Sequence, residues 1–415
     1  MKCTTRLTLI AATTCLFPVA TVLAADPAAV ADIVDRQIKP LMEEYDIPGM
    51  AVAVTVDGEE YFFNYGVASL DAQTPVTQDT VFEIGSVSKI FTSMLGTHAD
   101  TVGKLSLNDH PGEYLPELDG SPLDRATLLN FATYTAGNLP LQFPDTVGSD
   151  AEVSSYYAQF EPDTAPGEHR RYSNPSIGLF GHITALAMEG EFADLIQETL
   201  FDPLGLESSF IEVPEEAMER YAWGYNSENE PIRVNPGVLD GEAYGVKSSA
   251  ADLIRLVQAH IQPEGLDETM RRTIEGTQIG YFKIGEMVQG LGWEQYPYPI
   301  ALDRLLAGNS ATMAMEVNAA TELTPPLVPS EPRLFNKTGS TGGFGAYVAF
   351  VPEANVGVVM LANKNYPNPA RVTAGHAILA ELTDWTLTSQ LKSLTAPLPT
   401  EGGGPKSRPL PFDIF

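Results

Sequence analysis

The sequence has few cysteines and few histidines. Both cysteines, Cys3 and Cys15, lie at the very start of the 415-residue chain. If that segment is removed after export, the remaining chain has no disulfide and no thiol chemistry. The six histidines, which include His98, His182 and His376, are scattered without the spacing of metal ligands. We therefore expect no zinc site, no other metal and no cofactor.

Basic residues are also scarce. Lys and Arg number 24 against 54 Asp and Glu, which gives a formal charge of −30. An acidic surface of this kind repels phosphate backbones, so nucleic acid is excluded as a partner. The excess charge indicates a well-solvated surface and does not specify a substrate.

The apolar stretch at the N-terminus is typical of a secretory signal. Lys2 and Arg6 precede a mostly apolar segment, Leu7 to Val22, and small residues before and at Ala24 suit cleavage after that residue. The segment is short and is broken by two threonines and a proline, which argues against a membrane anchor. A lipid anchor on Cys15 is a weak alternative, because the apolar run before it is brief. We predict a periplasmic or secreted protein that has no membrane contact after cleavage of residues 1–24.

The first hundred residues predict a helix followed by a hairpin. Apolar residues recur at helical spacing over residues 28–45. Residues 50–56 and 61–67 are rich in β-branched and aromatic residues, and they flank the turn signal Asp57-Gly58.

The end of the chain predicts three further strands and a helix. The strand-like runs cover residues 334–338, 345–351 and 356–361, and residues 370–387 are expected to form the closing helix. Between the two β-rich ends the chain shows helical patterns, such as residues 176–188 and 192–200, and little strand signal.

Strands at both ends with helices between them favour one antiparallel sheet that is built from the two ends of the chain. We predict an α/β (α+β) fold with flanking helices and an inserted, mostly helical domain. Residues 25–84 and 246–394 would form the sheet domain and residues 85–245 the helical domain, including a long loop at 213–245. The Pro- and Gly-rich segment 395–415 is expected to be a disordered tail.

Ser86 and Lys89 are the first candidate catalytic residues. They are three positions apart in a segment that Gly85 opens and that is expected to be helical, so they share one face. An amine beside a hydroxyl is what a weak nucleophile needs in order to lose its proton. A second Ser-x-x-Lys, Ser389 to Lys392, shows that the spacing alone is weak. The start of a helix distinguishes Ser86, because free N–H groups there favour developing negative charge.

Two later motifs could complete an acyl-transfer site. Tyr172-Ser173-Asn174 follows the basic patch His169-Arg170-Arg171, and positive charge nearby lowers the pKa of a phenol. Lys337-Thr338-Gly339 ends a predicted strand and offers a charge, a hydroxyl and a close backbone approach. Each motif alone also has an ordinary structural interpretation. The occurrence of all three motifs in this order along the chain is what favours a catalytic site.

In that order, Ser-x-x-Lys, Tyr-x-Asn and Lys-Thr-Gly, the chain resembles the class C serine β-lactamases, a family of secreted cephalosporin-hydrolysing enzymes. Tyr172-Ser173-Asn174 stands where class A enzymes have Ser-Asp-Asn. Asn138 and Ile90 depart from the family pattern, which bears on substrate range. The resemblance extends through these blocks: Phe82 to Lys89, Thr135 to Phe143, Tyr172 to Gly181, Glu242 to Leu253, Gly290 to Trp293, Phe335 to Pro352 and Met360 to Val372.

The resemblance implies a role for each matching residue. Ser86 would attack the β-lactam carbonyl, Lys89 and Tyr172 would share the proton transfers, and Lys337 would keep Tyr172 acidic. The backbone N–H groups of Ser86 and Ser340 would form the oxyanion hole. Further family positions would bind the substrate: Thr338, Gly339, Asn368 and Arg371 near its carboxylate, and Gln142, Asn174 and Tyr244 near its side-chain amide.

The resemblance implies an enzyme that hydrolyses cephalosporins and penicillins through an acyl-enzyme and thereby confers antibiotic resistance. We expect it to act as a monomer. Two alternatives stay open. One is a serine carboxylesterase or D-alanyl-D-alanine peptidase on the same fold, although such esterases tend to lose Lys-Thr-Gly. The other is a β-lactam sensor that is acylated and stalls, although sensors usually carry a membrane domain.

Overall fold

The computed structural model describes residues 26–395. The predicted signal segment, both cysteines and residues 396–415 of the predicted tail lie outside this range. Within it, no helix has the length and apolar character needed to cross a bilayer.

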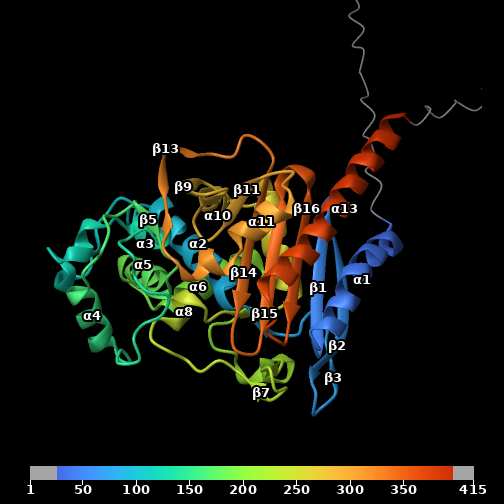
Figure 1. The fold of residues 1–415 in the computed structure, drawn as a ribbon, viewed down its shortest axis with the longest axis horizontal. Coiled ribbons are helices and arrows are strands. Elements are labelled where there is room, and N and C mark those ends of the chain that lie inside the picture. The colour runs from blue at the N-terminus through green and yellow to red at the C-terminus, as the bar shows by residue number, and fades with distance from the viewer. Residues whose placement is uncertain (1–25, 396–415) are drawn as a thin grey trace, which may run out of the picture.

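A large antiparallel sheet dominates the right half of Figure 1. Within the described residues it has ten strands. In spatial order these are β13 (Thr321–Leu327), β9 (Gly280–Ile284), β10 (Met287–Gln289), β11 (Glu294–Pro297), β14 (Arg333–Ser340), β15 (Gly345–Val351), β16 (Val356–Ala362), β1 (Gly49–Val56), β2 (Glu59–Ser69) and β3 (Thr74–Pro75).

The two ends of the chain meet inside this sheet, as the sequence predicts. Strand β1 pairs with β16 from Met50↔Ala362 to Val56↔Val356, and with β2 on its other side. Every residue of β1 is buried, which explains its nearly continuous apolar sequence. The expected fold class is thereby confirmed.

Helices cover both faces of the sheet. One face packs against α1 (Pro27–Glu44) and α13 (Asn368–Thr395), which also contact each other and lie together at the right of Figure 1. The other face packs against α9 (Ala250–Ile261) and the buried helix α2 (Ser88–Thr101). Alternate residues of β1 supply the two cores: Val52 faces the first and Ala53 the second.

The helical part at the left of Figure 1 has a core of its own around Phe131, Tyr157 and Phe180. It is connected to the sheet through α2, which packs against α5 and α10. The helices of this part are α3 (Leu128–Ala132), α4 (Asp150–Gln159), α5 (Asn174–Ala187) and α8 (Asp240–Ala243). Helices α6 (Phe192–Ile196), α7 (Asp202–Leu204) and α10 (Glu268–Thr277) contribute their apolar residues to the core beneath the sheet. The division into two domains at residues 84 and 246 stays a prediction.

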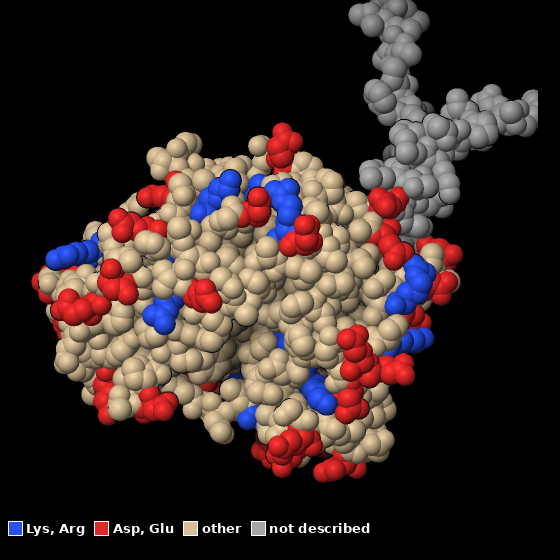
Figure 2. Space-filling view, in the orientation of Figure 1, with Lys and Arg blue, Asp and Glu red and all other residues tan. Residues whose placement is uncertain are grey.

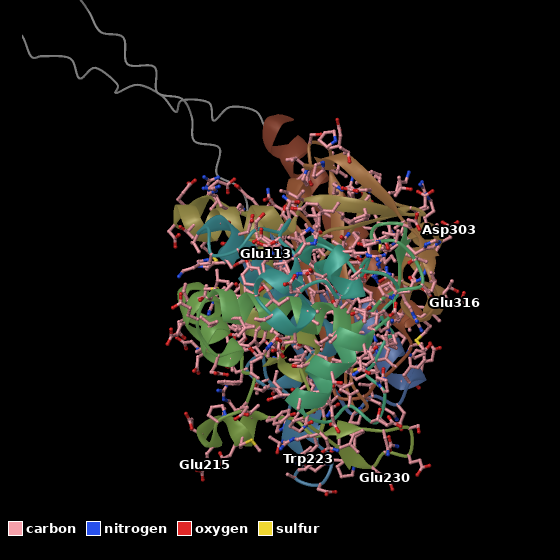
Figure 3. All side chains as sticks on the ribbon, turned by 90° about the vertical axis from the view of Figure 1, so that its left-hand side faces the viewer. Glu113, Glu215, Trp223, Glu230, Asp303 and Glu316 are labelled. Atoms are coloured by element: carbon pink, nitrogen blue, oxygen red, sulfur yellow. The ribbon has the colours of Figure 1, made fainter. Side chains whose placement is uncertain are left out.

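Two expectations need correction. Residues 213–245 are more ordered than a plain loop, because they contain a 3-10 helix (Glu215–Arg220), two short strands, β6 (Gly224–Tyr225) and β7 (Pro231–Ile232), and α8. Glu215, Trp223 and Glu230 of this segment lie along the lower end of the molecule in Figure 3. Strands β9, β10, β11 and β13 had no clear signal in the sequence, because they are short or interrupted by prolines and polar residues.

The last helices and short strands complete the fold. Helix α13 extends beyond the predicted residues 370–387 at both ends. The remaining elements are β4 (Phe82–Glu83), β5 (His169–Arg170), β8 (Lys247–Ser248), α11 (Leu302–Gly308), α12 (Ala311–Met315) and β12 (Asn318–Ala319).

Candidate active site

The turn that carries Ser86 lies against the end of β14. Gly85 has φ +52°, a left-handed conformation that glycine adopts without strain, and a Cβ there would lie 2.5 Å from the backbone nitrogen of Ser340. A Cβ on Gly339 would lie 1.9 Å from the carbonyl oxygen of Ile84. These two close approaches bring the backbone N–H groups of Ser86 and Ser340 into the same corner of the molecule.

The amine of Lys89 lies beside the hydroxyl of Ser86, as the helical spacing predicts. Ser86 lies in a 3-10 turn (Gly85–Val87) that continues into α2, and Lys89 Nζ is 3.2 Å from Ser86 Oγ. Lys89 is fully buried and also donates to Asn174 Oδ1 at 2.7 Å and to Ala243 O at 2.6 Å. Burial lowers the pKa of Lys89, and Lys337 lowers it further, although Tyr172 opposes the shift.

The geometry around Lys89 favours a role for its amine as the base that accepts a proton from Ser86. Two carbonyl oxygens accept two of its N–H groups, so in the neutral amine the remaining tetrahedral position, the lone pair, faces Ser86. A neutral Lys89 could therefore accept the proton of the serine hydroxyl directly.

Tyr172 lies between the two buried lysines. Lys89 Nζ and Lys337 Nζ lie 5.1 Å and 5.0 Å from the centre of its ring. Burial raises the pKa of the Tyr172 phenol, but the charges of Lys337 and Lys89 outweigh burial and hold that pKa below its usual value. The ring is placed by the start of α5, where Ser173 caps the helix by accepting the N–H of Ser176 and Pro175 occupies the first turn.

The sequence predicted the direction of this pKa shift and attributed it to the basic patch before Tyr172, while the family resemblance attributed it to Lys337. The structure supports Lys337 as the cause and corrects the role of the basic patch. Arg171 turns away and donates to Asn138 O at 3.1 Å. Arg170 lies 5.5 Å from the Tyr172 ring, but it is engaged with Gln289, Met313 and Glu294.

Glu294 is a residue of the site that the sequence did not indicate. Its Oε1 lies 3.4 Å from both Lys337 Nζ and Arg170 Nη2, and all three side chains are buried. Burial lowers the pKa of Lys337, but Glu294 and Tyr172 together raise it more, so the net shift is upward and Lys337 stays charged. A lone Glu in a four-residue strand has no local signal, because its partners are 43 and 124 positions away.

Two cavities open on either side of Ser86. The first, of about 280 Å³, is lined on the β14 side by Lys337, Thr338, Gly339 and Asn368. The second, of about 380 Å³, is lined by Gln142, Asn174 and Tyr244. Ser86, Tyr172 and Ser340 line both cavities. Figure 2 shows this face of the molecule, which is hollowed between the helical part and the sheet, with most acidic side chains around its edge.

Arg371 does not line either cavity. It is fully buried behind the end of β14, where Nη1 donates to Gly339 O at 2.5 Å and to Ser340 Oγ at 2.9 Å. Nη2 donates to Asn365 Oδ1 at 2.6 Å. The structure therefore places Arg371 as a support of Ser340, in contrast to the direct substrate contact that was expected.

The remaining predicted residues, although remote in the sequence, line one or both cavities, except Lys89, which is buried beside Ser86. Asn138, where relatives were expected to have Gly, adopts φ +70°, a conformation that Asn tolerates better than most residues, and donates to Asp163. Among the described residues there is no group of three His, Cys, Asp or Glu that could hold a metal ion.

Comparison with known proteins agrees with this geometry. The family model named Beta-lactamase matches residues 34–383. A β-lactamase of Pseudomonas fluorescens is 51% identical over 350 residues, which cover 84% of this chain and 98% of the relative. The chain belongs to the β-lactamase family.

Solved structures show which class of β-lactamases the chain resembles. A class C β-lactamase in complex with cefoxitin is 46% identical, with a TM-score of 0.83, and the match covers 86% of this chain and all of that one. A Pseudomonas syringae protein described as a β-lactamase/D-alanine carboxypeptidase is 45% identical, with a TM-score of 0.83, covering 85% of this chain and 99% of that one. The resemblance to class C enzymes is thereby confirmed.

Proposed function

We propose that this chain is a class C serine β-lactamase that opens the β-lactam ring of cephalosporins and penicillins through an acyl-enzyme on Ser86. One observation carries the proposal. Lys89 Nζ is held by two carbonyl oxygens and lies 3.2 Å from Ser86 Oγ, and this serine lines both cavities.

In the acylation step Ser86 Oγ attacks the lactam carbonyl carbon and the ring C–N bond breaks. The serine proton passes through Lys89 and Tyr172 to the departing ring nitrogen, and both groups have a pKa that lies below the usual value. The backbone N–H groups of Ser86 and Ser340 stabilise the negative oxygen of the tetrahedral intermediate.

Deacylation adds water to the same carbonyl. Tyr172 as the phenolate, alone or with the substrate's own ring nitrogen, accepts a proton from that water, and Ser86 leaves with a proton. Lys337 keeps Tyr172 acidic and attracts the substrate carboxylate, because Glu294 holds Lys337 in its charged form. Which of Lys89 and Tyr172 is the base in acylation is left open.

The two cavities separate the two ends of the substrate. Lys337, Thr338 and Asn368 would bind the carboxylate in the first cavity. Gln142, Asn174 and Tyr244 would contact the acyl side chain in the second. We further propose that the chain is exported to the periplasm, is cleaved after Ala24 and acts as a monomer without a cofactor.

A D-alanyl-D-alanine carboxypeptidase is the second candidate, because the related Pseudomonas syringae structure carries both names. The same serine, amine and oxyanion donors would serve either substrate, since both reactions form an acyl-serine. The related sensor and carboxylesterase alternatives share this first step as well. The fate of the acyl-enzyme separates them.

The test is steady-state turnover of a chromogenic cephalosporin and release of D-alanine from an acyl-D-alanyl-D-alanine peptide. We expect many turnovers of the cephalosporin and loss of at least about 1,000-fold in Ser86→Ala. The control variant Ser227→Ala changes an exposed serine and retains full activity. A single burst with a stable adduct on Ser86, or cleavage of the peptide or a short ester alone, would overturn the proposal.

A further inference from the structure

A separate cavity of about 250 Å³ lies outside the catalytic cleft. It is bounded by α4, α5, α8 and the 3-10 turn Pro116–Leu118. Apolar side chains such as Val153, Leu179 and Leu239 form much of its wall. The volume is smaller than that of most drug-binding pockets, so it suits a small molecule.

Carboxylates dominate the polar lining of this cavity. Glu117, Asp150, Glu191 and Glu242 line it, and His182 is the one base among them, while no Lys or Arg of the described residues lies in its wall. Burial lowers the pKa of His182, although Asp150, Glu117 and Glu191 oppose the shift. The cavity therefore carries uncompensated negative charge.

Glu242 gives the cavity a built acidic group. The residue is only 8% exposed, and no Lys, Arg or other side chain binds its carboxylate in the described part of the chain. The stem is fixed against α5, because a Cβ on Gly181 would lie 2.7 Å from Glu242 Cγ. The carboxylate is thus buried, faces the cavity, and has only its own backbone N–H as a donor.

Burial accordingly raises the pKa of Glu242 to about 7. Its own N–H lowers this pKa, while Asp240 on the same helix and Asp150 on α4 raise it. A positive charge in the cavity would relieve the cost of ionising Glu242 in this position.

We propose that this cavity binds a small organic cation, a primary ammonium on a short apolar body. The ammonium would pair with Glu242, and the apolar body would contact Val153, Leu179 and Leu239. A metal ion is a poor occupant, because no group of metal ligands is present within residues 26–395 and the wall is largely apolar.

The position of the site connects it to the catalytic cleft. Glu242 is followed by Ala243, whose carbonyl oxygen accepts from Lys89, and by Tyr244, which lines the second catalytic cavity. Thr92 of α2 donates to the carbonyl oxygen of Glu242 at 2.6 Å. The proposed cation and a β-lactam would thus contact opposite sides of the same short segment.

The test is calorimetric titration of the purified protein with benzylammonium chloride at pH 8. We expect one site, and about tenfold weaker binding to Glu242→Gln, in which the charge is removed at constant shape. At pH 6 binding to the unmodified protein should weaken by about tenfold, because Glu242 must lose a proton, and Glu242→Gln should lack most of this pH dependence.

Three controls make the result decisive. Benzyl alcohol, the neutral analogue, should not bind, and Glu228→Gln, on the exposed surface, should bind as the unmodified protein does. Val153→Phe should abolish binding by filling the cavity, with turnover of β-lactams retained, so it tests the site even if Glu242→Gln does not fold. Equal binding to Glu242→Gln and the unmodified protein, equal binding of benzyl alcohol, or undiminished binding to Val153→Phe would each overturn the proposal.

Discussion

Lys89 Nζ lies 5.1 Å from the centre of the Tyr172 ring, with both side chains buried beneath Ser86. In this position the two groups can exchange a proton with the serine, and each lowers the cost of the other's charge in this buried place. Burial without such a neighbour would have the opposite effect on the pKa of the phenol.

Tyr172→Phe is expected to lower kcat by about 100- to 10,000-fold, because it removes the hydroxyl that transfers protons and keeps the ring. The matched control is Tyr134→Phe. The Tyr134 ring lies 4.8 Å from that of Tyr172, but Tyr134 does not line either catalytic cavity. Its kcat should stay within a few-fold of the original, and a near-normal rate in Tyr172→Phe would contradict the proton role.

Lys337→Ala and Glu294→Gln should shift the acidic limb of the pH profile of kcat/KM in opposite directions. Lys337 lowers the pKa of both Tyr172 and Lys89, so its removal raises both and moves the limb to higher pH. Glu294 raises both, and Tyr172 still favours the charged form of Lys337 when Glu294 is neutralised, so this variant moves the limb to lower pH. These signs hold whichever of the two groups is the base.

Lys337→Ala should also lower kcat by orders of magnitude. Lys104→Ala changes an exposed lysine in the turn after α2, so it serves as the control and should leave the profile unchanged. Shifts of the same sign in the Lys337 and Glu294 variants would show that the charges around Tyr172 are assigned incorrectly.

Gly339→Ala should disturb the site through the backbone. The new Cβ would overlap the carbonyl oxygen of Ile84, so β14 and the turn before Ser86 must separate. We expect a loss of about 1–3 kcal/mol in the free energy of unfolding and about 100-fold in kcat/KM. Gly265→Ala has no atom within 4 Å of its Cβ and should change neither quantity. Chemical denaturation measures the free energy of unfolding, and initial rates measure kcat/KM. If Gly339→Ala and Gly265→Ala gave equal values of both, the close contact between residue 339 and Ile84 would be excluded.

His260 should make stability fall at acidic pH. It is buried beside Trp293, with Nδ1 2.8 Å from Leu256 O, and burial lowers the pKa of its imidazole to about 4. A lowered folded pKa means that its stabilisation is present above the unfolded value of 6.5 and is lost as pH falls towards 4.

The loss amounts to about 3 kcal/mol between these limits. Urea unfolding of the original protein and of His260→Gln at pH 7 and pH 4.5 measures this loss by difference, since the remaining titratable groups affect both proteins alike. An identical pH dependence in the two proteins would rule out a contribution from His260.

Local sequence predicted the elements whose signal is local. Residues 50–56 formed a strand because apolar residues occupy both faces, and Ser86 and Lys89 met because they share a turn of helix. Glu294 was missed, because its function depends on Lys337 and Arg170, which reach it only through the folded sheet. Arg371 was assigned to substrate binding from the family resemblance alone. Its hydrogen bonds to Gly339 and Ser340 depend on how α13 packs against the sheet, which the spacing of residues in the sequence does not reveal.

The position of β1 between β2 and β16 determines when the chain can finish folding. During synthesis the first hairpin emerges early, but its partner is made some three hundred residues later. Until then one edge of an apolar strand has no neighbour, and closure of such distant pairings is slow. A truncated product that stops before residue 356 would expose that edge, so we expect it to aggregate or be degraded.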